Sequence, residues 1–75
     1  MRRKNTAAYR VVKVYATDLA MGDVLIDASG ERIGRIVSDP EADSDGYVYA
    51  DVYADTKVRG QRWPDTRLVR IRIPR

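Results

Sequence analysis

The sequence predicts an all-β fold, a small antiparallel β-barrel of about five strands. Apolar and polar residues alternate in several short stretches, which is the period of a strand with one buried face. Clusters of Gly, Pro and Asp separate these stretches and supply the turns between them. No stretch keeps a helical period for more than a turn, and no internal repeat is present. The 75 residues suffice for one domain, near the lower size at which a single core is stable.

Residues 1–8 form a basic segment without a pattern, and we expect a flexible arm there before the barrel domain of residues 9–75. The first strand is expected over residues 9–16. Its inward side chains would be Val12, Val14 and Ala16, and its outward ones Tyr9, Val11, Lys13 and Tyr15.

A central hairpin is expected over residues 24–37. Val24, Ile26 and Ala28 alternate with Leu25 and Asp27, so the first three would share the buried face. Asp27 and Gly30 suit the two corners of the turn, because Asp accepts backbone N–H groups and Gly tolerates positive φ. The return strand carries Ile33, Ile36 and Val37 out of strict alternation, which indicates a β-bulge at Gly34. Ahead of the hairpin, a tight turn over residues 18–23 would place Leu19 and Met21 in one end of the barrel.

Within this hairpin, the segments Gly22-Asp23-Val24, Asp27-Ala28-Ser29-Gly30-Glu31 and Ile33-Gly34-Arg35-Ile36 resemble the opening of PRC-barrel domains. These are small SH3-like barrels that mediate contacts in photosynthetic reaction centres and in ribosome-maturation factors. The resemblance covers residues 22–55. In composition the whole chain resembles the short barrels of high-GC actinobacteria and their phages. If a phage encodes the chain, the expected location is the host cytoplasm, and the protein-interaction alternative given below would be an adaptor or virion component.

The second half of the chain should contain two strands, over residues 47–55 and 67–73. They are separated by a loop over residues 56–66, with a short strand near Val58 as an alternative, and preceded by a polar loop over residues 38–46. Together with the first half, these strands define a predicted core of Val12, Val14, Val24, Ile26, Val48, Val52, Val69 and Ile71.

Composition argues against an enzyme. The chain has no His, which is the commonest general base and metal ligand, and no Cys, so thiolate metal sites and disulfides are excluded. No cofactor or metal is therefore expected. The acidic loop over residues 41–46 has oxygens at alternate positions before a Gly, as calcium loops do. It lacks the closing Glu, so a solvated loop is expected there. There is no apolar run long enough to span a membrane and no signal peptide, which predicts a cytoplasmic protein.

The charges are sorted along the chain. Residues 1–13 carry five basic groups and no acid, residues 14–56 have a net charge of −8, and residues 57–75 have a net charge of +6. The first and last strands of SH3-like barrels usually lie close together, so the basic ends would merge into one surface that attracts phosphates. This predicts a nucleic-acid site of Arg2, Arg3, Lys4, Arg59, Arg62, Trp63, Arg70 and Arg72. In the alternative interpretation, Arg70 and Arg72 pair with Asp51 and Asp55 on a neighbouring strand, and Trp63 covers the core.

The second candidate surface is the polar face of the strand over residues 47–55, with Tyr47, Tyr49, Tyr53 and Asp51. Tyr beside Asp suits a protein interface better than a phosphate backbone, which the acids would repel. A protein partner or a homo-oligomer is therefore the alternative to nucleic acid. In the simplest interpretation, the tyrosines only cover one end of a small core.

Overall fold

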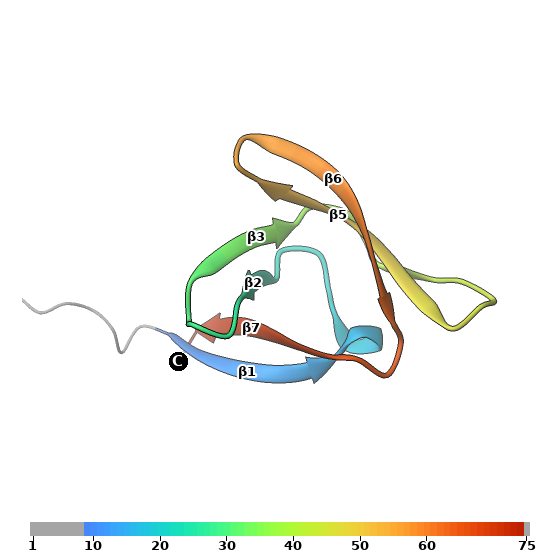
Figure 1. Ribbon diagram of the computed structural model, residues 1–75, viewed down its shortest axis with the longest axis horizontal. Helices are drawn as coiled ribbons and strands as arrows, with labels where there is room; N and C mark the ends of the chain where they lie inside the picture. Colours follow the sequence, from blue (N-terminus) through green and yellow to red (C-terminus); the bar gives the residue numbers. More distant parts are fainter. Residues whose placement is uncertain (1–8, 75) are drawn as a thin grey trace, which may run out of the picture.

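The computed structural model describes residues 9–74, and the fold is all-β as predicted (Figure 1). The helix η2 is a single 3₁₀ turn, and these residues include no helix with the length and apolarity that crossing a membrane requires. The elements are, in chain order, β1 (Tyr9–Tyr15), η2 (Ala16–Asp18), β2 (Val24–Ile26), β3 (Arg32–Ile36), β4 (Glu41–Ala42), β5 (Tyr47–Ala54), β6 (Lys57–Pro64) and β7 (Leu68–Pro74).

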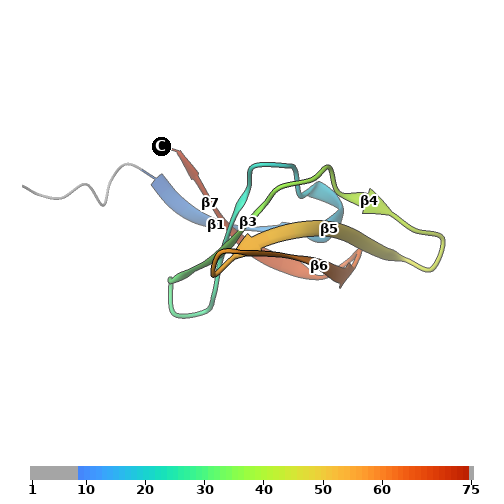
Figure 2. The ribbon, with the colours of Figure 1, turned by 90° about the horizontal axis from the view of Figure 1, so that it is seen from above.

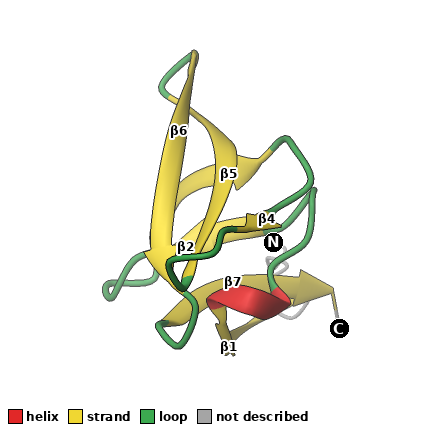
Figure 3. Ribbon diagram, turned by 90° about the vertical axis from the view of Figure 1, so that its right-hand side faces the viewer, coloured by secondary structure: helices red, strands yellow, loops and turns green. Residues whose placement is uncertain are grey.

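The seven strands form one antiparallel sheet in the order β1-β7-β2-β3-β5-β4, with β6 added on β5. The short strand β4 lies beside the first part of β5 (Figure 2). The sheet curls, so that the β5–β6 hairpin faces the β1–β7 pair across the interior (Figure 1), and η2 lies at one end of the curl (Figure 3). Within residues 9–74, β1 pairs only with β7 and β6 only with β5, so the barrel is open between these two edge strands.

The core lies on the inner face of this curl and confirms the inward positions predicted for β1, β5 and β7. Half-buried side chains of Val12, Val14, Val69, Ile73 and Trp63 pack against it. Each fully buried aliphatic side chain stabilises the fold by about 1.5–3 kcal/mol. The buried cluster consists of Ala16, Leu19, Leu25, Ile36, Val48, Ala50, Val52 and Ile71.

The phase predicted for β2 is wrong. Leu25 is in the core, whereas Val24 lies on the other face of the sheet, in register with Arg72 on β7 and Arg35 on β3. Ile26 is also buried, but outside the main cluster. After Leu25 the register between β2 and β3 shifts by one residue, since Leu25 pairs with Gly34 but Ile26 pairs with Arg32. This shift is a β-bulge in β3.

The bulge predicted at Gly34 is therefore present, with Ile33 as the extra, exposed residue beside it. Gly34 itself is buried, and an added Cβ would meet Val52 Cγ1 at 2.6 Å and the Tyr53 carbonyl oxygen at 3.1 Å. The bulge and the missing side chain together let β3 lie close against β5.

The turns before and inside the β2–β3 hairpin mostly follow the prediction. Asp27 Oδ1 accepts the backbone N–H groups of Ser29 at 2.9 Å and of Glu31 at 3.0 Å, and Gly30 has φ +91°. Leu19 is buried as expected. Met21 is not, because its turn points it outward and leaves the side chain 57% exposed.

The prediction of a loop over residues 56–66 is wrong, because residues 57–64 form strand β6. The alternative of a short strand near Val58 is closer, but the strand is longer than expected. A two-residue turn of Asp55 and Thr56, both at positive φ, reverses the chain so that β6 pairs with all of β5. Such turns usually contain Asn or Gly, and their absence hid the hairpin in the sequence. The interior of the predicted 38–46 loop likewise contains β4.

Replacing Gly34 with Ala should destabilise the protein by about 2 kcal/mol, because the new methyl group overlaps a buried side chain and a backbone oxygen. Urea unfolding monitored by circular dichroism measures the loss. Gly60→Ala is the matched control: the nearest atoms that its Cβ would meet belong to the exposed side chain of Tyr49, which can turn outward, and not to a buried side chain or to the backbone. Equal costs for the two substitutions would contradict the close contact of β3 with β5.

The turn at Asp27 predicts a pH dependence of stability. The Ser29 hydroxyl, followed by the Glu31 backbone N–H, holds the pKa of Asp27 below its usual range. The carboxylate therefore stabilises the fold above about pH 4, and this contribution is lost as the pH falls through the lowered pKa. Asp27→Asn keeps an acceptor oxygen but does not titrate. The stability advantage of the wild type over this variant should shrink on acidification; a constant difference would contradict the assignment.

Candidate nucleic-acid interface

The two ends of the described chain lie side by side as neighbouring strands. β1 and β7 pair antiparallel over their full lengths, from Tyr9 opposite Pro74 to Tyr15 opposite Leu68. The predicted convergence of the basic ends is therefore present for these two strands. Arg2, Arg3 and Lys4 lie outside the described residues, so their part in the predicted site stays a prediction.

The outer face of this pair is basic. Lys13 lies directly opposite Arg70, and Arg72 lies between Val11 on β1 and Val24 on β2. The same lateral row continues to Arg35 on β3, which is opposite Val24. We call Lys13, Arg35, Arg70 and Arg72 the outer basic face. No Asp or Glu occurs in β1 or β7, so nothing within these two strands balances its charge.

The alternative interpretation of Arg70 and Arg72 is wrong. They were to pair with Asp51 and Asp55, but β7 lies between β1 and β2 and does not neighbour the strand that carries Asp51. Within residues 9–74 the single ion pair joins Arg62 to Asp43 at 3.3 Å, on the β5–β6 side of the sheet. The arginines of β7 therefore face solvent and other cations.

Two exposed aromatic rings lie at the ends of β1 on this side of the sheet. Tyr9 is 42% and Tyr15 is 52% exposed, and Lys13 projects from the strand between them. The guanidinium of Arg72 lies over the Tyr9 ring, 4.0 Å from its centroid. This cation–π contact holds the guanidinium of Arg72 against a ring that stays partly exposed.

The remaining predicted site residues lie in other places. Arg59 is opposite Val52, and Trp63 is opposite Val48, so both are on the inner face of the sheet. Trp63 is half-buried against the core, as the alternative interpretation proposed. Arg62 projects from the outer face of β6 and covers the Tyr47 ring at 4.2 Å from its centroid. The five predicted residues that the structure describes therefore do not form one surface.

On the Tyr/Asp face of β5, Tyr49 and Tyr53 are exposed, Tyr47 and Asp51 are half-buried, and the face makes contacts of its own. The Tyr49 hydroxyl donates to Asp51 Oδ1 at 3.1 Å, and this hydrogen bond raises the pKa of Tyr49. Next to it, Asp43 accepts the backbone N–H of Tyr47, which is the main reason that its pKa is lowered, and it also pairs with Arg62.

Lys13 and Arg35 are the residues that sequence reasoning left out of the site. A signal for Lys13 was available, because alternation already placed it outward on β1 together with Tyr9 and Tyr15. Arg35 had none: the bulge beside Gly34 determines the face on which it lies, and only the register of β2 with both neighbours places it in the row of Arg72.

Comparison with known proteins identifies no relative of this chain. The chain matches no protein-family model, and neither the comparison with curated proteins nor the comparison with solved structures gives a match. The resemblance of residues 22–55 to PRC-barrel domains therefore stays a prediction.

Proposed function

We propose that this protein is a non-enzymatic module that binds nucleic acid through its outer basic face. The observation that carries the proposal is the direct cross-strand pairing of Lys13 with Arg70, with Arg72 and Arg35 beside them on the same side of the sheet. Like charges opposite each other on neighbouring strands are unfavourable. A row of phosphates would replace this repulsion by attraction.

The surrounding side chains support the same ligand. The exposed rings of Tyr9 and Tyr15 offer stacking surfaces at the two ends of β1, and a base that stacks on such a ring gains about 1–3 kcal/mol. The proposal includes the SH3-like or PRC-like relationship and a cytoplasmic location, that of the host if a phage encodes the chain. Both rest on sequence resemblance and composition.

Neutralising the outer basic face should make nucleic-acid binding both weaker and less dependent on salt. Each phosphate contact contributes about 0.9 to the slope of log K against log salt for duplex DNA and about 0.7 for single strands. The triple variant Lys13→Gln, Arg70→Gln, Arg72→Gln should therefore have a slope shallower by about 2–3. Fluorescence anisotropy with labelled duplex and single-stranded oligonucleotides between 50 and 200 mM salt, roughly the range over which such contacts are lost, measures it.

The matched control removes the same charge elsewhere. Lys57→Gln, Arg59→Gln, Arg62→Gln changes three exposed basic residues of β6, outside the outer basic face, and it should retain most of the binding. If both triple variants lose affinity equally, net charge rather than this face is responsible. If the wild-type protein binds neither duplex nor single strands at low salt, the nucleic-acid proposal is wrong.

The second candidate function is a protein interface on the Tyr/Asp face. The specific observation is that exposed apolar surface gathers there: Tyr53 lies directly opposite Val58, and Tyr49 covers Gly60 on the same face. Tyrosine in such a setting is a frequent anchor of protein interfaces. The partner would be another protein or a second copy of this chain.

Tyr49→Ala and Tyr53→Ala separate this function from simple surface cover. Both rings are more than 40% exposed, so we expect each substitution to change the free energy of unfolding by no more than about 0.5 kcal/mol. If the rings are interface anchors, binding of the partner, or self-association measured by sedimentation, should weaken by about 2 kcal/mol. A loss of about 3 kcal/mol in folding stability would instead mean that this face is buried in an assembly.

A further inference from the structure

The inner face of β6 differs from that of the strands around it. Its residues Lys57, Arg59 and Gln61 are opposite Ala54, Val52 and Ala50 of β5, and therefore point to the side of the sheet on which the core lies. Cations are rarely placed toward an apolar core without a partner. Here they remain exposed, because the barrel is open along the edge that β6 forms.

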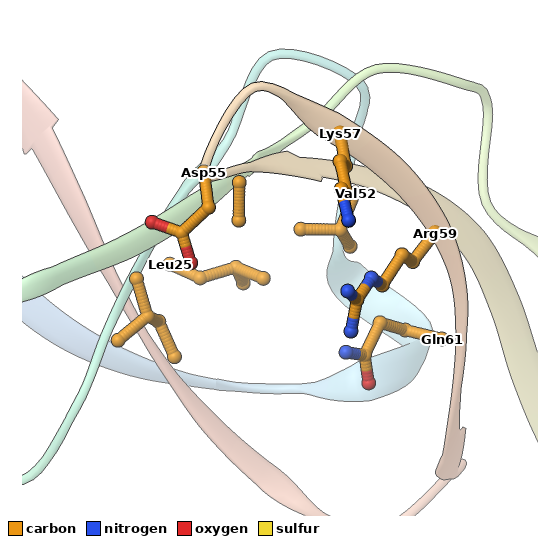
Figure 4. Close-up of a pocket in the computed structure, with 8 residues that line it drawn as sticks. Leu25, Val52, Asp55, Lys57, Arg59 and Gln61 are labelled. Carbon is orange, nitrogen blue, oxygen red and sulfur yellow. The ribbon is translucent and has the colours of Figure 1, made fainter.

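These side chains form one wall of an open pocket of about 170 Å³. Figure 4 shows the Lys57 amine, the Arg59 guanidinium and the Gln61 amide directed from β6 into the space that Leu25 and Val52 line. Leu25 and Val52 belong to the buried core, so the pocket has an apolar floor beneath its cationic wall. At about 30 Å³ per water molecule, its volume equals that of about six waters.

The cations of this wall have no anionic partner within the described part of the chain. Neither Lys57 nor Arg59 makes an ion pair there, since the one pair present joins Arg62 to Asp43. Asp55 lies on the rim of the same pocket without forming such a pair. Its charge leaves one net positive charge among the three ionised groups, which favours a ligand with a single negative charge.

We propose that this pocket binds a small amphiphilic carboxylate, independently of the outer basic face. The carboxylate would accept hydrogen bonds from the Arg59 fork and the Lys57 amine, a charge-assisted arrangement that guanidinium geometry favours. A short apolar chain or ring would cover Leu25 and Val52. The competing explanation is that inward charges on β6 only protect an edge strand from pairing with other chains.

The test uses sodium hexanoate as the probe and the intact protein. Backbone amide shifts of Leu25, Val52 and Gln61, which line the pocket, measure binding and localise the site. Trp63, the single tryptophan, is the next inner residue of β6 after Gln61 and lies outside the lining, so its fluorescence is a second readout only. We expect saturable binding of hexanoate in the millimolar range and at least tenfold weaker binding of hexylamine. This comparison requires no variant. No saturable response to hexanoate, or equal binding of the amine, would overturn the proposal and leave edge protection as the role of the charges.

Substitutions at two residues of β6 make the test more specific. Arg59→Gln should weaken hexanoate binding about tenfold or more, while Arg62→Gln, which removes the same charge from the opposite face of β6, should leave it unchanged. Arg59→Lys keeps the charge and should retain part of the affinity, provided that circular dichroism shows a folded protein. Equal effects of Arg59→Gln and Arg62→Gln would mean that hexanoate responds to net charge, and the proposed site would be wrong.

Discussion

The structure depends on one constraint: a single sheet has to bury its own inner face, because the described residues provide no second layer. The sheet meets it by curling until the β5–β6 hairpin faces the β1–β7 pair across the core. The curl requires the bulge at Ile33 and the absence of a side chain at Gly34, where β3 and β5 approach most closely. It also leaves the outer face without a covering layer, so that its side chains are exposed or half-buried.

This constraint separates the two candidate sites. The outer basic face exists because β1 and β7 present every second residue to solvent and none of these residues is acidic. The pocket exists because the curl stops before β6 reaches β1, which leaves part of the inner face uncovered. One site follows from alternation along the strands, and the other follows from incomplete closure of the barrel. The basic residues of β6 divide between the two faces of the sheet: Lys57 and Arg59 point inward, to the pocket, and Arg62 points outward.

Alternation was sufficient to predict β1, β5 and β7 and their inward side chains, because a period of two is unambiguous over seven or eight residues. It failed for β2, where three residues are too few to set a phase and the bulge in the partner strand shifts the register. It also failed for β6, whose inner positions are Lys57, Arg59 and Gln61, so that no hydrophobic period marks a strand. The prediction of the candidate site was incomplete for the same reason, because alternation does not give the order of the strands. Charge along the chain identified Arg70 and Arg72, and alternation already placed Lys13 outward on β1. Only the strand order and register separate the two arginines from their supposed acidic partners and add Arg35.

The pairing of Lys13 with Arg70 has opposite consequences for folding and for binding. In the free protein the two cations repel each other, so added salt screens the repulsion and favours the folded sheet. In the complex with nucleic acid that we propose, the same salt would weaken each phosphate contact. A face made for stability alone would have placed an acid opposite one of these cations, as Asp43 is placed near Arg62 on the other hairpin. Because exposed pairs of that kind contribute only up to about 1 kcal/mol, their absence costs the fold little. The outer face can therefore keep an unbalanced charge for a ligand without endangering the core beneath it.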